Sequence, residues 1–218
     1  MAGGQRQWSA KVVARLSLYR RLLADQMNES QTHIYSHELA KLACVSAAQV
    51  RRDIMTVDYS GTPNRGYEVR ELLDDLSRTL DQREGENVAL LGIGNIGRAL
   101  IAFFAGRRPK LAITAAFDSD PSKVNRVLFG CRCHPMESLR EVIEAEGIRT
   151  AILTVPPRAA QAAAAALVDA GITGILNYAA VPLRLPRHVY LTDYDMTMAL
   201  ETVAFFARRS RLAEQKPS

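Results

Sequence analysis

The stretch VALLGIGNIGRAL, residues 88–100, decides how the second half of this chain folds. It combines an apolar run typical of a buried strand, a turn with the spacing Gly-x-Gly-x-x-Gly, and the start of a helix. Such glycines permit a tight turn and a close backbone approach, and the helix N-terminus attracts a pyrophosphate through its free N–H groups and positive dipole. The sequence therefore predicts a dinucleotide-binding loop made of Gly92, Ile93, Gly94, Asn95, Ile96 and Gly97.

Apolar runs alternate with helical segments after this loop. The runs are VALLGIG, AITAAFDSD, TAILTVP, GILNYAA and HVYLTDYD. Such alternation is typical of a parallel sheet with crossover helices, and with the glycine loop it predicts a Rossmann domain over residues 85–194. Asp118 ends the second run, where a carboxylate accepts ribose hydroxyls and repels a 2'-phosphate, so the sequence favours NAD over NADP. Lys123 and Arg126 are expected to face solvent.

The residues that acid/base or metal chemistry requires are not arranged for it. The second half leaves little room for the substrate domain of most nicotinamide enzymes, and its histidines lie in no recognisable acid/base motif. The run Cys131-Arg132-Cys133-His134 offers zinc-ligand residue types, but a structural zinc site needs a second ligand pair. We therefore expect no catalytic residue and no metal, and interpret this run as the edge of a strand.

The first part of the chain, residues 1–84, has the pattern of a helix-turn-helix. Three helices are predicted: Ser9–Met27, a short one capped by Ser36, and Ser46–Val57 with Ser46 and Gln49 at capping-box spacing. Gln49, Arg51 and Arg52 lie early in the third helix, where side chains reach base edges and phosphates. A solvated basic face is the alternative interpretation of these residues.

A hairpin is expected to follow the third helix. In TVDYSGTPNRGYEV, residues 56–69, two β-prone runs flank a tip at Asn64-Arg65-Gly66, which together suit the wing of a winged helix. Arg65 at the tip is equally consistent with a minor-groove contact and with a polar turn residue. An amphipathic helix, ELLDDLSRTLDQ, then leads to a polar junction near residue 84.

Composition limits the remaining possibilities. The 218 residues are 48% hydrophobic and 23% charged, as in ordinary globular proteins, and the net charge of +5 weakly favours an anionic partner. We find no signal peptide and no membrane-length apolar run, and three cysteines do not make a disulfide framework, so we expect a cytoplasmic protein without membrane contact. A last helix from Asp195 has an apolar face with Met196, Leu200 and Val203, which requires a partner.

Taken together, the two halves resemble the Rex family of redox-sensing repressors over nearly the whole chain. The segments that carry the resemblance are VARLSLYRRLL, SHELAKLACVSAAQVRRDI, VALLGIGNIGRAL, AAFDSDPSKV, AILTVPPRAAQ and GILNYAAVPL. The resemblance implies a homodimer that binds inverted-repeat operator DNA and releases it when NADH replaces NAD+. It also implies that residues 195–218 are a dimerisation helix and tail, with the helix swapped onto the partner.

The resemblance assigns roles to residues one by one. Cofactor contacts beyond the glycine loop and Asp118 are expected at Thr154, Val155, Pro156, Asn177 and Tyr178, with Asp195 and Met196 closing on the neighbouring nicotinamide. The expected DNA-binding residues are Lys41, Ser46, Gln49, Arg51, Arg52, Asn64 and Arg65. Two departures stand out. The wing lacks the family's phenylalanine-glycine pattern, and Phe103 or Phe104 replaces a tyrosine that many members have after the glycine loop.

The predicted fold class is therefore α/β, with an N-terminal winged helix-turn-helix domain and a C-terminal Rossmann domain with a parallel sheet and a swapped helix. Two rival functions remain open from the sequence. One is a small NAD-dependent oxidoreductase whose N-terminal domain only mediates assembly. The other is a regulator with the same domain architecture that responds to another nucleotide, such as a CoA ester.

Overall fold

A computed structural model gives the fold of this protein and describes residues 8–28, 30–57, 59–61, 65–107 and 110–214. The chain divides into two compact units, Met1–Glu84 and Gly85–Ser218, each with its own hydrophobic core. The first unit is mostly helical and the second is an α/β sandwich, so the predicted α/β class is confirmed.

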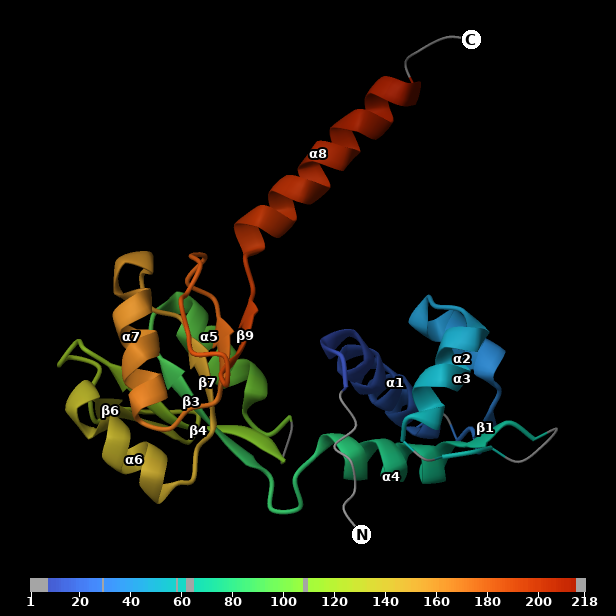
Figure 1. The fold of residues 1–218 in the computed structure, drawn as a ribbon, viewed down its shortest axis with the longest axis horizontal. Helices are drawn as coiled ribbons and strands as arrows, with labels where there is room; N and C mark the ends of the chain where they lie inside the picture. The colour runs from blue at the N-terminus through green and yellow to red at the C-terminus, as the bar shows by residue number, and fades with distance from the viewer. Residues whose placement is uncertain (1–7, 29, 58, 62–64, 108–109, 215–218) are drawn as a thin grey trace. The chain divides into compact units, whose positions relative to one another are not determined.

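In the described part of unit 1, four helices form a bundle beside a minimal sheet (Figure 1). Its elements are α1 (Ala10–Asn28), β1 (His33–Ile34), α2 (Ser36–Ala43), α3 (Ala47–Met55), β2 (Tyr67–Glu68) and α4 (Val69–Leu80). Leu16, Tyr19 and Leu23 of α1 pack on Leu72 and Leu76 of α4, all of them buried. The short helices α2 and α3 attach to this core through apolar side chains at helical spacing, namely Leu39, Ala40, Val50 and Ile54.

The helix-turn-helix forms with caps that differ in part from those predicted. Ser36 is the first residue of α2 and does not cap it; Tyr35 is the N-cap residue, and its backbone N–H donates to the Glu38 carboxylate at 2.7 Å. Ser46 caps α3 as predicted, because its hydroxyl accepts the Gln49 N–H at 3.1 Å. The predicted capping box is only half formed, since the Gln49 side chain bonds Asp53 and Arg52 and not the Ser46 backbone. Cys44 closes α2 in the left-handed conformation, which gives the sharp turn between the two helices.

The described part of the predicted wing has a strand pairing that the sequence did not indicate. Among the described residues, Thr56, Val57 and Tyr59 lie in no strand, and residues 58 and 62–64 of the expected hairpin lie outside the described residues. Tyr67–Glu68 pairs antiparallel with His33–Ile34, which lies before α2. The Tyr59 hydroxyl instead accepts the Glu68 N–H at 3.2 Å and tethers the segment after α3 to β2. Arg65 is described and exposed, whereas Asn64 lies outside the described residues.

Unit 2 is built on a seven-stranded sheet in the order β5-β6-β4-β3-β7-β8-β9. Its strands are β3 (Glu86–Leu91), β4 (Leu111–Asp118), β5 (Val127–Leu128), β6 (Cys131–Pro135), β7 (Thr150–Leu153), β8 (Gly174–Asn177) and β9 (Tyr190–Asp193). All neighbouring pairs are parallel except β5 with β6, which form a short hairpin at one edge. The chain order reverses between β3 and β7, and ligands bind at such switch points in open α/β sheets.

Helices cover both faces of this sheet (Figure 1). They are α5 (Asn95–Phe104), α6 (Leu139–Ala145) after the 3-10 turn η1 (Met136–Ser138), and α7 (Pro157–Asp169). Alternate residues of β3 separate the two layers: Leu91 packs with α6 and α7, whereas Leu90 packs with Ile101 of α5. Period-two alternation in strands with apolar residues throughout explains why both faces are buried.

A long last helix, α8 (Met196–Glu214), follows β9. Every residue from 196 to 209 is exposed, including the apolar side chains of Met198, Leu200, Val203, Phe205 and Phe206. Among the helices that the structure describes, none combines the length and apolar character of a membrane span.

Candidate functional site

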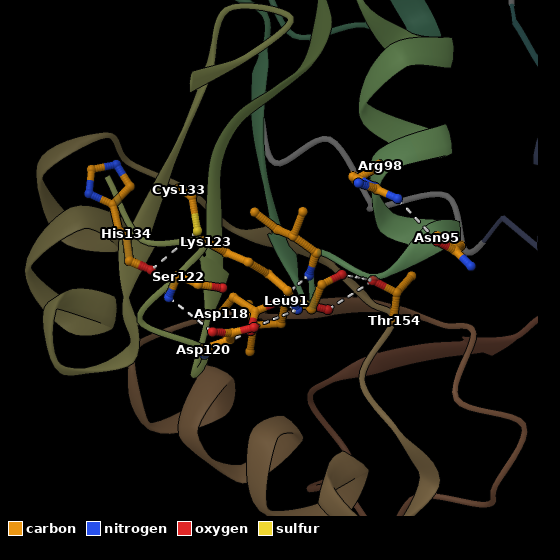
Figure 2. A network of polar contacts seen from close by, with 12 residues as sticks. Leu91, Asn95, Arg98, Asp118, Asp120, Ser122, Lys123, Cys133, His134 and Thr154 are labelled. Carbon is orange, nitrogen blue, oxygen red and sulfur yellow. Dashed lines mark hydrogen bonds and ion pairs between the residues drawn. The ribbon is translucent and has the colours of Figure 1, made fainter. Parts of the chain in front are cut away.

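The glycine loop between β3 and α5 forms the turn that its spacing predicts. Gly92 has a φ of +96°, and a Cβ there would lie 2.8 Å from the Thr154 carbonyl oxygen. A Cβ on Gly97 would lie 2.2 Å from the Gly92 carbonyl oxygen, so this glycine lets α5 approach the loop closely. The Thr154 hydroxyl donates to the carbonyls of Leu91 and Gly92, at 3.0 and 2.7 Å, and ties β7 to the loop (Figure 2).

Gly94 differs from the other two glycines because a Cβ there would meet nothing within 4 Å. It is the N-cap residue of α5 and has no side chain with which to cap the helix. The open space beside it therefore faces the positive end of α5, where an anionic group is stabilised by the helix dipole and by backbone N–H groups.

A cavity of about 960 Å³ opens at this end of the sheet. Of the residues predicted to bind cofactor, it is lined by Gly92, Gly94, Asn95, Ile96, Asp118, Thr154, Val155, Pro156 and Tyr178. The switch point of the sheet, the open helix N-terminus and the cavity thus coincide. Its volume lies at the upper end of the range for small-molecule and cofactor sites.

Asp118 is held in place by three hydrogen bonds (Figure 2). One carboxylate oxygen accepts the Ile93 N–H at 2.7 Å and the Lys123 ammonium at 3.0 Å, and the other accepts the Asp120 N–H at 2.9 Å. Burial alone would raise the pKa of Asp118, but these donors outweigh it and lower the pKa below its ordinary value. The residue is therefore an anion at neutral pH, fixed between the glycine loop and the chain after β4.

The expectation that Lys123 faces solvent is wrong, since its ammonium pairs with Asp118 and the residue lines the cavity. Arg126 is exposed, as expected. Lys123 also lies 3.8 Å from a carboxylate oxygen of Asp120, a second cavity residue that the sequence interpretation missed. The pKa of Asp120 is lowered by hydrogen bonds from Ser122. Two carboxylates and one ammonium thus leave one net negative charge at the end of β4.

Five residues predicted to contact cofactor do not line this cavity. Ile93 and Gly97 are buried beneath the loop that they shape. Asn177 is 1% exposed; its amide donates to the Val181 carbonyl and to Asp193, and its oxygen accepts the Ala179 N–H. Asp195 caps the start of α8 by accepting the Met198 N–H, and Met196 is exposed on that helix.

The far wall of the cavity was missed from the sequence. It consists of one face of α7 with Ala159, Ala162, Ala163 and Ala166, together with Phe117 and Met136. Helix α7 packs on the sheet through Ala160, Ala164 and Leu167. The 3–4 spacing of the remaining alanines is the signal for a second, open face of the same helix.

Unit 1 has exposed basic side chains on α2, on α3 and just before β2. Lys41 of α2, Arg51 and Arg52 of α3 and Arg65 before β2 are all exposed. The Arg51 guanidinium donates to the Ser36 hydroxyl at 3.0 Å, and Arg52 donates to the Gln49 side-chain oxygen at 3.0 Å. Cationic side chains on one helix of a helix-turn-helix are suited to phosphates and guanine edges.

The Cys131–His134 run forms most of β6, which is not at the edge of the sheet because β5 pairs outside it. Both of its thiols are buried, and burial raises the pKa of Cys131 to about 12. Within the described parts of the chain, no three His, Cys, Asp or Glu side chains are grouped so that they could hold a metal ion.

Comparison with known proteins agrees with both units. The family model "Putative DNA-binding protein N-terminus" matches residues 9–54, and the model "CoA binding domain" matches residues 83–181. The redox-sensing transcriptional repressor Rex of Latilactobacillus sakei is 39% identical over 195 residues, which cover 89% of this chain and 94% of that protein.

Solved structures give the same result. RSP, a Rex-family repressor, has been solved in complex with β-NAD+ and operator DNA; it is 27% identical, and the TM-score is 0.87 over 97% of both chains. Its complex with β-NADH has a TM-score of 0.83 over 97% of this chain and 99% of that one. These relatives are transcriptional repressors and not enzymes, which agrees with the expectation from the sequence. The chain belongs to the Rex family of redox-sensing transcriptional repressors.

Proposed function

We propose that this repressor binds NADH and NAD+ in the unit 2 cavity, with the pyrophosphate at Gly94 and the N-terminus of α5. The observation that carries the proposal is the open space at Gly94, between two glycines whose own Cβ positions are blocked by backbone. The adenosine ribose then lies near Asp118 and Asp120, and Thr154, Val155, Pro156 and Tyr178 lie toward the nicotinamide. The RSP complexes with β-NAD+ and β-NADH support this assignment.

Operator DNA is the proposed partner of unit 1. Helix α3 enters the major groove, Arg51 and Arg52 contact bases or phosphates, and Lys41 and Ser46 contact the backbone. Arg65 belongs to the wing, on the side of the unit formed by β1 and β2. Because bacterial operators lie in the cytoplasm, we expect the protein to act there.

A homodimer is the proposed assembly. The exposed side chains of α8, among them Leu200, Val203 and Phe206, form an apolar surface that a stable monomer would not leave in water. Burying α8 against a second copy removes this surface from water and brings Asp195 and Met196 to the partner's cofactor. An inverted-repeat operator has the same twofold symmetry as such a dimer.

In this proposal, NADH lowers operator affinity by favouring a different arrangement of the two subunits. Half-sites of a dimer lie a whole number of turns apart, about 34 Å each, so a modest rotation breaks simultaneous binding. A difference in affinity of about 1–3 kcal/mol between the two arrangements is sufficient for regulation.

Calorimetry on the full chain tests the cofactor assignment. NADH and NAD+ are expected to bind, NADPH more weakly, and CoA not at all. Binding of CoA in place of dinucleotides would contradict the assignment and favour a regulator that responds to CoA esters. Sedimentation of the full chain tests the dimer: Val203→Glu and Phe206→Glu, changed together on α8, are expected to yield monomers, whereas wild-type protein that sediments as a monomer would contradict the proposal.

A further inference from the structure

Among the described residues of unit 1, Asp53 is the most deeply buried charged one, at 2% exposure, although it lies on the helix that carries Arg51 and Arg52. The Arg15 guanidinium of α1 donates to both carboxylate oxygens, at 2.6 and 2.8 Å. The Tyr19 hydroxyl donates at 2.9 Å and the Gln49 amide at 2.8 Å. Burial would raise the pKa of Asp53, but these donors lower it below its ordinary value, so the carboxylate is ionised at neutral pH.

The two neighbours of Gln49 fix the direction of its amide. An ionised carboxylate only accepts hydrogen bonds, so the nitrogen of Gln49 must face Asp53. A guanidinium only donates, so the oxygen of Gln49 must face Arg52, which donates to it at 3.0 Å. The hydrogen bonds therefore run one way, from Arg52 through Gln49 to Asp53, and connect an exposed side chain to the buried contact between α1 and α3.

We propose that Gln49 is a positioning residue that orients Arg52 for DNA, and that it does not read bases itself. This inference rests on the proposed DNA binding by unit 1 and revises the role expected for Gln49 from the sequence. Each end of its amide is held by one hydrogen bond within the protein, so the amide is directed at Asp53 and Arg52, whereas the Arg52 guanidinium has several donors beyond the one given to Gln49. Gln49 restricts the rotamers of this long side chain, which lowers the entropy that Arg52 loses on binding DNA.

Arg51 provides the matched comparison. It is adjacent in sequence and exposed like Arg52, but its guanidinium donates to Ser36 at the start of α2 and not to Gln49. If Gln49 acts through Arg52, replacing Gln49 leaves the position of Arg51 unchanged. Arg51 and Arg52 thus differ in the contact under test and share the charge, the helix and the exposure.

A double-mutant cycle on the full chain tests the inference. The probe is a DNA duplex enriched by the wild-type protein from a randomised pool, and affinities are measured at one fixed salt concentration. Gln49→Met keeps the length of the side chain and removes both hydrogen bonds; we expect about a fivefold loss of affinity, the effect of one well-placed hydrogen bond. Arg52→Ala is expected to lose about 10- to 100-fold.

The decisive comparison is between the two double variants. We expect the variant with both Gln49→Met and Arg52→Ala to bind as Arg52→Ala does, because Gln49 has nothing left to orient. With Arg51→Ala in place of Arg52→Ala, the two losses should multiply. Losses that multiply in both cycles would overturn the inference and make Gln49 a direct DNA contact, as would an Arg52→Ala variant that binds like the wild type.

Two controls separate this inference from the proposed function. Fluorescence of Trp8, the single tryptophan of the chain, which packs on the unit 1 core, reports whether each variant remains folded. If Gln49→Met unfolds unit 1, Gln49→Ala takes its place in both cycles. A wild-type chain that enriches no duplex contradicts the proposed DNA binding, whereas enrichment followed by multiplying losses contradicts only the role of Gln49.

Discussion

Two buried carboxylates, Asp53 in unit 1 and Asp118 in unit 2, are satisfied in different ways. All the donors to Asp53 are side chains, and two of them come from another helix. Asp118, at 8% exposure, accepts two backbone N–H groups and one lysine, and it lines a cavity. The first carboxylate joins two helices, whereas the second holds a loop beside the cavity. We therefore expect Asp53 to affect stability and Asp118 to affect ligand selection.

Removing the cationic partner of Asp53 is expected to reduce stability more than any other substitution considered. Arg15→Met removes two donors and leaves a buried anion without its cationic partner, which costs about 3–5 kcal/mol of the unfolding free energy of unit 1. Urea unfolding followed by Trp8 fluorescence measures this loss. Arg21→Met, at an exposed position of the same helix, is the control and should change stability by less than about 0.5 kcal/mol. Equal stability of the two variants would contradict the role given to Asp53.

Two substitutions in the glycine loop of unit 2 test where the pyrophosphate binds. Gly97→Ala places a Cβ against backbone and is expected to cost about 1–3 kcal/mol of stability as well as NADH affinity. Gly94→Ala meets no protein atom, so stability should be unchanged while NADH affinity falls by about tenfold or more. Thermal unfolding and calorimetry distinguish the two variants. A Gly94→Ala variant with normal NADH affinity would show that the pyrophosphate does not occupy this space.

Removing the charge of Asp118 tests ligand selection. Asp118→Asn releases Lys123 from its ion pair, so the ammonium becomes available to a 2'-phosphate. We expect the preference for NADH over NADPH to fall by about tenfold, as measured by the ratio of the two dissociation constants. Asp120→Asn, at the more exposed carboxylate of the same cavity, is the comparison and should change the ratio less. An unchanged ratio in Asp118→Asn would assign the selection to Asp120.

The smallest effect is on pH dependence. The pKa of Asp53 is lowered in the folded state from an ordinary value of 3.8, so its contribution to stability is present above that pH. This contribution is lost as the pH falls below 3.8 toward the folded-state pKa. Trp8 unfolding midpoints at pH 5 and pH 3 should therefore differ more in the wild type than in Asp53→Asn. The same acid sensitivity in both proteins would assign it to other carboxylates.

The sequence predicted features that depend on neighbouring residues better than features that depend on distant ones. The glycine loop, the alternating strands and the Ser46 cap depend on residues close together in the chain, and the structure confirms each of them. By contrast, Tyr67–Glu68 pairs with a two-residue strand at His33–Ile34, which is far from it in the chain and has no distinctive pattern, and this pairing was not predicted.

Side-chain contacts between residues far apart in the chain were also not predicted from the sequence. Asp53 contacts Arg15 across 38 residues, and nothing in either segment marks this pair. Lys123 lies only five residues from Asp118, yet a turn of unknown shape separates them, so its orientation could not be inferred. The roles of single site residues, such as Gln49, depend on contacts of this kind. Motif spacing therefore predicted where the sites lie but not what each residue does in them.

We propose that the dinucleotide bound in unit 2 controls the affinity of unit 1 for DNA. Titration of the full chain and its selected duplex with NADH and with NAD+, in separate experiments at constant salt, tests this claim directly. We expect NADH to weaken DNA binding by about 5- to 150-fold and NAD+ to leave it unchanged. Equal effects of the two cofactors, or no effect of either at saturation, would contradict it.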